Sequence, residues 1–338
     1  MSDAGVRTVE WRRLLLDLVL ILVVAGAYHG AGWVGLLQRV VVEGAQVTPT
    51  WPPTGIALAC LLWGGLKIWP GIAVGTYLAI EQLGSFDPED LVIVAGNTLA
   101  PVCAYLLLRR TGFRIELDRL RDGLLLVFLG GLLPMLISAT LGVSTLVFTG
   151  KLPASDVWGV WAAWWAGDAM GVLLVTPLLL VLPRIRPVSR VTRDPFRAAE
   201  AVALGATTAV VTVAATRSGL SLLFLVFPLL IWAAVRFQLP GAAPCALAVS
   251  VLSVSAAIDR VGPFAGHTLL EIMVNLQALN GAAALTGLLL AALVTEQNNI
   301  RLQIERACED LVEVVAHLSS GGRPDPGAGG LPARPDQG

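Results

Sequence analysis

The sequence predicts an all-α protein that crosses a membrane many times, and three observations support this prediction. Hydrophobic residues make up 56% of the 338 residues, whereas charged residues make up 14%, below the share of about 25% in soluble proteins. Apolar segments follow one another from residue 14 to residue 294. These segments are rich in Leu, Ala and Val and lack strand alternation. Because backbone groups in lipid must be paired within the protein, we expect a polytopic transmembrane helical bundle.

Ten segments are expected to form the membrane spans. A helix needs about 20 apolar residues to cross a bilayer, and the second, third and eighth segments are shorter than this. An eight-span alternative therefore treats 53–83 as a re-entrant hairpin and merges or drops another weak segment. The ten expected spans are 14–36, 53–66, 68–83, 91–108, 123–148, 157–182, 198–216, 220–235, 240–257 and 267–294.

The basic residues orient the predicted bundle. With ten spans and a cytoplasmic N-terminus, only Arg39, Lys151, Arg217 and Arg260 of the 23 Lys and Arg residues lie outside. This bias follows the positive-inside rule, so both termini are expected in the cytoplasm. The basic loops at 109–121 and 184–197 are explained by topology and by contact with the lipid bilayer, and they predict no nucleic-acid partner. The first span lacks a cleavage site and is expected to remain as an anchor.

The chain is divided by composition into four parts. Residues 1–13 form a cytoplasmic N-terminus and residues 14–294 the membrane domain. Residues 295–318 are expected to form an amphipathic or coiled-coil helix, either dimerising or lying on the membrane surface. Residues 319–338 are Gly/Pro-rich and are expected to be disordered. We expect no catalytic output domain after the last span, because residues 295–338 are too few. The apolar stripe of the helix comprises Ile300, Ile304, Leu311, Val315 and Leu318.

The second span begins in an interrupted segment. Trp51, Pro52, Pro53 and Gly55 lie within Val47–Gly55, where proline would break a continuous helix. A helix is therefore expected to start at Pro52 or Pro53, below the outer surface. Its N–H groups could then face a cavity and hold a polar or anionic ligand. The alternative is a helix start capped by Thr50, with Trp51 in the interfacial aromatic belt.

The sixth span carries an acid on an aromatic face. Trp161, Trp164, Trp165 and Asp168 are spaced i, i+3, i+4 and i+7, which places them on one face of a helix. A carboxyl group inside a membrane needs a partner and is a candidate functional group. Gly171, with Gly167, permits close approach of another element. The pattern predicts a Trp-walled pocket with an acidic floor, or alternatively a buried acid bonded to an Asn or to backbone.

Other polar residues could complete this site. Asn97 lies in the fourth span, and the last span has His267, Glu271 and Asn275 on one face of its outer half. Either Asn97 or this face could pair with Asp168. The histidines and acids have no metal-ligand spacing. The four cysteines have no CxxC spacing. We therefore expect no metal, no cofactor and, without a nucleophile–base pair, no enzyme activity.

Several motifs together resemble one family. They are Trp51–Gly55, Trp69–Gly71, Gly96–Leu99, Trp164–Asp168 with Gly171 and Pro177, Phe227–Pro228 through Trp232, Arg236-Phe237, and Gly262–Phe264. This set resembles the first type of bacterial membrane-associated sensor domain, the MASE family, from about residue 12 to residue 294. The resemblance implies an inner-membrane sensory input, usually of eight spans. In the family this input usually precedes a histidine kinase, a diguanylate cyclase or a phosphodiesterase.

The resulting hypothesis is a multi-pass sensor or receptor in the bacterial plasma membrane. It would perceive an unknown small-molecule ligand or a membrane state and signal through the 295–318 helix to a separate kinase or cyclase. Self-association into a homodimer is a further expectation. The alternatives are a secondary transporter of a small polar or anionic solute, favoured by the broken span and the intramembrane acid, and a membrane anchor or scaffold. The motif at Arg236 joins the candidate residues through the family resemblance.

Overall fold

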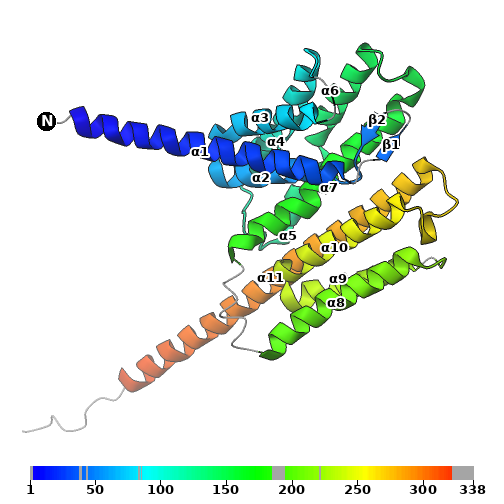
Figure 1. The fold of residues 1–338 in the computed structure, drawn as a ribbon. Helices are drawn as coiled ribbons and strands as arrows, with labels where there is room; N and C mark the ends of the chain where they lie inside the picture. Colours follow the sequence, from blue (N-terminus) through cyan, green and yellow to red (C-terminus); the bar gives the residue numbers. More distant parts are fainter. Residues whose placement is uncertain are drawn as a thin grey trace, which may run out of the picture. The chain divides into compact units, whose positions relative to one another are not determined.

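The computed structural model describes residues 3–37, 40–42, 45–82, 84, 86–184, 195–220 and 222–321. It confirms the all-α class, with one two-stranded antiparallel hairpin in which Val40 pairs with Val47. Contacts divide the chain into a first unit ending at Thr295 and a second unit starting at Glu296. The tail expected to be disordered begins at residue 319, but α11 continues to Gly321. The rest of this tail, from residue 322 onward, lies outside the described residues. Figure 1 traces these elements: α1 Asp3–Leu36, β1 Val40–Val42, β2 Ala45–Val47, α2 Pro52–Gly64, η1 Leu66–Ile68, α3 Trp69–Glu81, α4 Asp90–Arg110, α5 Leu120–Leu125, η2 Leu126–Leu132, α6 Met135–Phe148, η3 Ala154–Asp156, α7 Val157–Val181, η4 Leu182–Arg184, α8 Pro195–Arg217, η6 Leu223–Leu225, α9 Val226–Phe237, α10 Leu239–Ile258, η7 Gly262–Phe264 and α11 Leu269–Gly321.

Each expected span corresponds to a helical segment, but the segments differ in length. Among the described residues, seven segments are long and apolar enough to cross a membrane. Helices α2 and α3 have 13 residues each and α9 has 12, which gives lengths of about 20 Å. A bilayer core is about 30 Å thick. The seven long segments are Trp11–Leu36, Asp90–Arg110, Leu120–Phe148, Ala154–Val181, Pro195–Arg217, Leu239–Ile258 and Leu269–His317.

The turn between α2 and α3 approaches the basic ends of two long helices. Lys67 Nζ lies 2.6 Å from Asp17 Oδ1 of α1, and Gly65 lies against Tyr105 of α4. The Tyr105 hydroxyl in turn accepts a hydrogen bond from Arg109 Nη1 at 3.0 Å. The short helices α2 and α3 therefore reach within about one helical turn of the basic end of α4.

The fifth predicted span is not one uninterrupted helix. It consists of α5, a π-helix from Leu126 to Leu132, and α6. The Leu133 N–H donates to Phe128 O at 2.9 Å, five residues back. Pro134 follows and has no N–H to continue the ladder. The proline therefore explains the wide turn that the apolar pattern of the sequence does not reveal.

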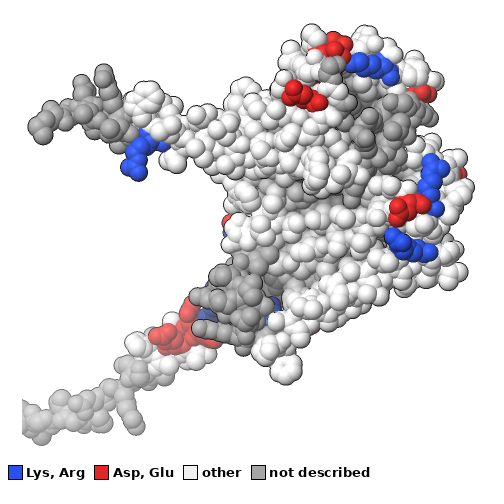
Figure 2. All heavy atoms as spheres, in the orientation of Figure 1, with Lys and Arg blue, Asp and Glu red and all other residues white. Residues whose placement is uncertain are grey.

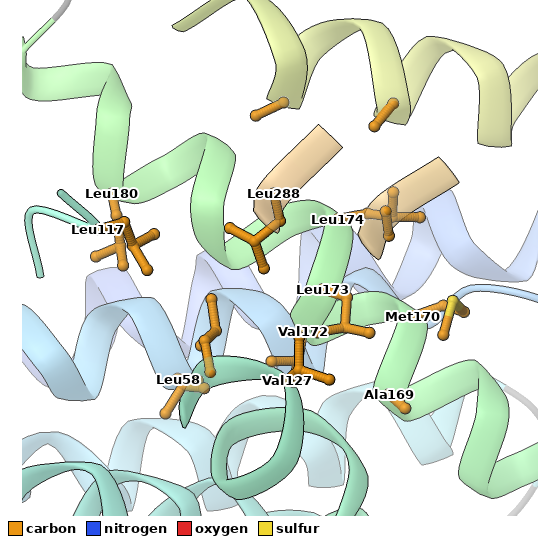
Figure 3. Packing of buried hydrophobic residues seen from close by; sticks show 14 of the residues in the cluster. Leu58, Leu117, Val127, Ala169, Met170, Val172, Leu173, Leu174, Leu180 and Leu288 are labelled. Atoms are coloured by element: carbon orange, nitrogen blue, oxygen red, sulfur yellow. The ribbon is translucent and has the colours of Figure 1, made fainter. Parts of the chain in front are cut away.

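Helix α7 forms the centre of the first unit. Its second half is buried on every side, and Figure 3 shows Leu173, Leu174 and Leu180 of α7 packed among residues that include Leu58 of α2 and Leu288 of α11. By contrast, α1 exposes most of its apolar side chains. On the face shown in Figure 2, Lys, Arg, Asp and Glu lie near the ends of the first unit's helices and leave a band without charged side chains between them. This band is what contact with lipid requires.

Candidate functional site

Asp168 of α7 is held by two hydroxyl groups from two other helices. Its side chain is 1% exposed. Thr54 of α2 donates its Oγ1 proton to Asp168 Oδ1 at 2.6 Å, and Ser138 of α6 donates to Asp168 Oδ2. We call these three residues the Asp168 clamp. Both carboxyl oxygens therefore have a donor, and the clamp joins α2, α6 and α7 inside the bundle.

The expectation that an asparagine pairs with Asp168 is wrong. Asn97 is buried, but its Nδ2 donates to Ile93 O of its own helix at 3.0 Å. Asn275 is exposed on α11. The actual partners are short hydroxyl side chains, which are common in spans and give no special signal in a sequence. Which of them meets Asp168 depends on how each helix is rotated, and an apolar pattern does not specify this rotation.

The tryptophans on the Asp168 face pack against the preceding span. Trp165 Nε1 donates to Leu132 O at 2.7 Å. This carbonyl is free because Leu136 N, its usual partner in an α-helix, donates to Leu133 O instead. Trp161 Nε1 donates to Thr140 Oγ1 at 3.1 Å, and its ring stacks on that of Trp165 with centroids 6.2 Å apart. The indole N–H groups of both residues are thus used in helix packing. The Trp164 ring covers Gly142 of α6.

The interrupted segment begins α2 at Pro52, as expected, but leaves no row of free donors there. Pro52 and Pro53 have no N–H, and Thr54 N donates to Trp51 O at 3.3 Å. The predicted ligand-binding helix terminus is therefore wrong. The alternative cap by Thr50 is also wrong, because the helix start has no side-chain cap and Thr50 Oγ1 lies 3.4 Å from Ser250 Oγ.

The same segment is pressed against α7 at two glycines. A Cβ on Gly171 would lie 2.0 Å from Trp51 O, and one on Gly55 would lie 2.1 Å from Gly171 O. Trp51 N donates to Gly167 O at 2.9 Å, and Thr176 Oγ1 donates to Gly55 O at 3.0 Å. The close approach predicted at Gly171 is present, with the interrupted segment as its partner. No side chain fits at either glycine.

The remaining predicted residues lie apart from the Asp168 clamp. Arg236, at the end of α9, donates from Nε to both carboxyl oxygens of Glu200 at 2.7 and 2.8 Å. Glu271 accepts from Thr268 N at 2.8 Å and lies 3.5 Å from His267 Nδ1. Arg236, Glu271 and His267 are all exposed. Glu271 therefore acts as part of the N-terminal cap of α11, and Arg236 joins two helix ends.

Two surface loops are also joined by an ion pair. Lys151 Nζ lies 2.9 Å from Asp87 Oδ2. The hydrogen bond to Asp87 raises the pKa of the Lys151 ammonium group above its ordinary value. Both side chains are more than 40% exposed, so the pair connects two loops and adds little stability. Among the described residues, no three His, Cys, Asp or Glu side chains converge as a metal site.

The structure contains a second set of buried polar side chains, which the sequence pattern did not predict. Gln277 Nε2 of α11 donates to Pro49 O at 2.8 Å, and Thr50 approaches Ser250 of α10. Ser253 and Asn280 are each 0% exposed. We call Thr50, Ser250, Ser253, Gln277 and Asn280 the Asn280 cluster. Gln277 and Asn280 are three residues apart and share a helix face, which is the signal that could have predicted them.

Comparison with known proteins identifies the family. The model of the MASE1 family matches residues 18–298, which is most of the chain. The chain belongs to the MASE1 family. MASE1 is a membrane sensor domain, in agreement with the apolar helices described above. The recognition made from the sequence motifs is thus confirmed.

One relative connects this MASE1 chain with a signalling enzyme. A probable diguanylate cyclase, DgcE of Escherichia coli (strain K12), is 28% identical over 205 residues. The match covers 57% of this chain and 17% of DgcE. The chain therefore spans under a fifth of that relative's length. No solved structure matches the chain.

Proposed function

We propose that this MASE1 chain is a sensory domain of the bacterial inner membrane that signals through the cytoplasmic end of α11. Membership of a family of membrane sensor domains supports the sensory role. The bias of Lys and Arg supports a cytoplasmic position for both termini. The relative DgcE is named a probable diguanylate cyclase, so a cyclase is the class of partner that the proposal favours.

The exposed apolar stripe of α11 carries this proposal. In the second unit, Ile300, Ile304, Leu311 and Val315 of this stripe are 50%, 58%, 63% and 63% exposed. Their steps of four, seven and four residues place them on one face of the helix, as in a short coiled coil. A coiled-coil seam of this kind is stable only when another helix covers it. The partner is therefore a helix with a matching apolar stripe, supplied by a second copy of the chain or by the output protein.

The continuity of α11 connects the stripe to the membrane. One helix runs from Leu269 to Gly321, and Ile272, Leu276 and Leu288 are buried in the first unit. A helix transmits shifts and rotations along its length because its backbone hydrogen bonds are regular. A ligand or membrane state that favours one arrangement of the bundle would thus shift the population of states that the partner reads.

The test uses Cys308, which is exposed beside the stripe. A bifunctional thiol reagent applied to membranes is expected to cross-link Cys308 to a second copy or to a partner. The double variant Ile304→Ser/Leu311→Ser should lose this product while the chain still inserts. Val312→Ser is the matched control, because Val312 is 69% exposed but lies off the stripe. A native chain that gives no Cys308 product, or a double variant that keeps it, would contradict the proposal.

A transporter is the second candidate, and one observation favours it. The non-helical residues 48–51 lie inside the bundle and bond to α7 and α11, an arrangement that broken helices give in transporters. Flux of small polar solutes into vesicles containing the purified chain separates the two functions. A sensor is expected to bind its ligand without moving it across the bilayer.

A further inference from the structure

The Asn280 cluster lies where α10, α11 and the interrupted segment meet. Gly287 of α11 lies against Ala242 and Ala246 of α10. The two helices run in opposite directions. Asn280 precedes Gly287 by seven residues, which is about two helical turns, and Ser253 follows Ala246 by the same number. From this register we infer that Asn280 and Ser253 lie at the same level of the two helices. The bonds of Pro49 to Gln277 and of Thr50 to Ser250 bring the interrupted segment against the same level.

Four polar atoms of this cluster have no protein partner. They are Ser253 Oγ, Gln277 Oε1, and both Oδ1 and Nδ2 of Asn280, all buried and without a hydrogen bond to any described residue. Buried polar side chains in proteins are nearly always hydrogen-bonded. An unbonded amide inside a membrane bundle opposes folding. Three side chains with unbonded buried atoms at one level of α10 and α11 therefore indicate a bound molecule that satisfies those atoms.

We propose that the Asn280 cluster binds a small neutral solute that both donates and accepts hydrogen bonds through hydroxyl groups. Asn280 Oδ1 and Gln277 Oε1 accept, Asn280 Nδ2 donates, and Ser253 Oγ can do either. A hydroxyl group matches this mixture, because it too donates and accepts. Water and a small polyol share this chemistry. The inference deepens the proposed sensory function, since a solute bound beside α11 is placed to bias that helix.

Charge excludes an ionic ligand at the cluster. None of Thr50, Ser250, Ser253, Gln277 and Asn280 carries a charge, and an uncompensated ion in an apolar interior is strongly disfavoured. Asp168, the buried acid of α7, has both oxygens engaged by Thr54 and Ser138. The cluster is therefore suited to a neutral molecule.

Room for about one water molecule lies next to the cluster. A small cavity begins at Ala246 and Ala284, about one helical turn from Ser250 and Asn280. Its walls come from α7, α10 and α11 and are apolar: Leu173, Leu174, Pro177, Leu239, Ala242, Ala243, Ala246, Ala284 and Leu288. This volume suits water, and a polyol could enter only if the surrounding side chains moved apart.

The test compares two Asn→Leu substitutions in the purified full-length chain. Asn280→Leu is expected to lower the Tm, followed by tryptophan fluorescence, by about 2–4 °C, because it removes the bonds to the bound solute. Asn97→Leu is the matched control, since Asn97 is also buried but bonds within its own helix. If the amide atoms of Asn280 have no bound partner, replacing Asn280 with Leu removes an unfavourable contribution to the free energy of folding. An unchanged or higher Tm of Asn280→Leu would therefore overturn the proposal.

Two further arms complete the test. Ser253→Ala is also expected to lower the Tm. If Asn280→Leu does not fold, the direction of the Tm change in Ser253→Ala decides whether the proposal holds. Glycerol, used as the polyol probe, is then added to the native chain and to Asn280→Leu. A larger rise in Tm for the native chain supports a polyol site, and an equal rise in both supports bound water. Neither Tm measurement needs a partner protein, so the binding site and the signalling role are tested separately.

Discussion

The Asp168 clamp and the Asn280 cluster are two buried polar groups that share one segment of chain. Residues 48–55 supply Thr54 to the clamp and Thr50 to the cluster. In the clamp, both carboxyl oxygens receive a hydroxyl donor. In the cluster, Asn280 has no bond from either amide atom to a described residue. A charged residue in a membrane can therefore be structural, while a neutral amide nearby is the better candidate for binding.

Substitution of Gly171 should disrupt both the Asp168 clamp and the Asn280 cluster, and it should destabilise the protein most. A Cβ there would lie 2.0 Å from Trp51 O, so Gly171→Ala must push residues 48–55 away from α7. We expect a loss of about 3 kcal/mol in the free energy of unfolding, measured by thermal unfolding in detergent. Gly159→Ala is the control in the same helix, because a Cβ on Gly159 meets nothing within 4 Å. Equal effects of the two substitutions would contradict the close contact.

Substitution of Asp168 should break the clamp alone, with an intermediate effect. Asp168→Leu leaves the buried hydroxyl of Thr54 without its acceptor, at a cost of about 2 kcal/mol, whereas Ser138 can still donate to Met135 O at 3.2 Å. Asp168→Asn keeps one oxygen acceptor and should cost less than about 1 kcal/mol. Unfolding of both variants is compared with that of the native chain. A Leu variant as stable as the native chain would show that the clamp contributes nothing to folding.

Substitution of Lys67 should have the smallest effect, because its ion pair is exposed. Lys67 and Asp17 are 53% and 40% exposed, and such pairs contribute about 0.5 kcal/mol or less. Lys67→Cys in a chain without its natural cysteines should therefore fold normally. We expect this thiol to react with a membrane-impermeant reagent from the cytoplasmic side, because the α2–α3 turn lies near the basic end of α4. Labelling from outside only would contradict this, and no labelling from either side would favour the re-entrant, eight-span alternative.

Some of this molecule could be predicted from its sequence and some could not. Apolar length predicts the helices, and the prolines predict the start of α2 at Pro52. The small residue at Gly171 predicts a close contact, because only a residue without a side chain permits one. The partners of Asp168 could not be predicted, since they depend on the rotation of three helices. The four-residue spacing from His267 favours Asn275, but the structure exposes Asn275 and buries Asn280, because residues five apart on a helix face different directions.

The central claim is that a change in the helical bundle is transmitted to the cytoplasmic end of α11. Amide hydrogen exchange tests this claim most directly. Asn280 lies 16 residues before Glu296 on the same helix. Exchange at residues 296–317 is measured by mass spectrometry in the native chain, Asn280→Leu and Asp168→Asn. The account predicts faster exchange there in Asn280→Leu and native exchange in Asp168→Asn. Identical exchange in all three chains would contradict the coupling between the Asn280 cluster and the signalling helix.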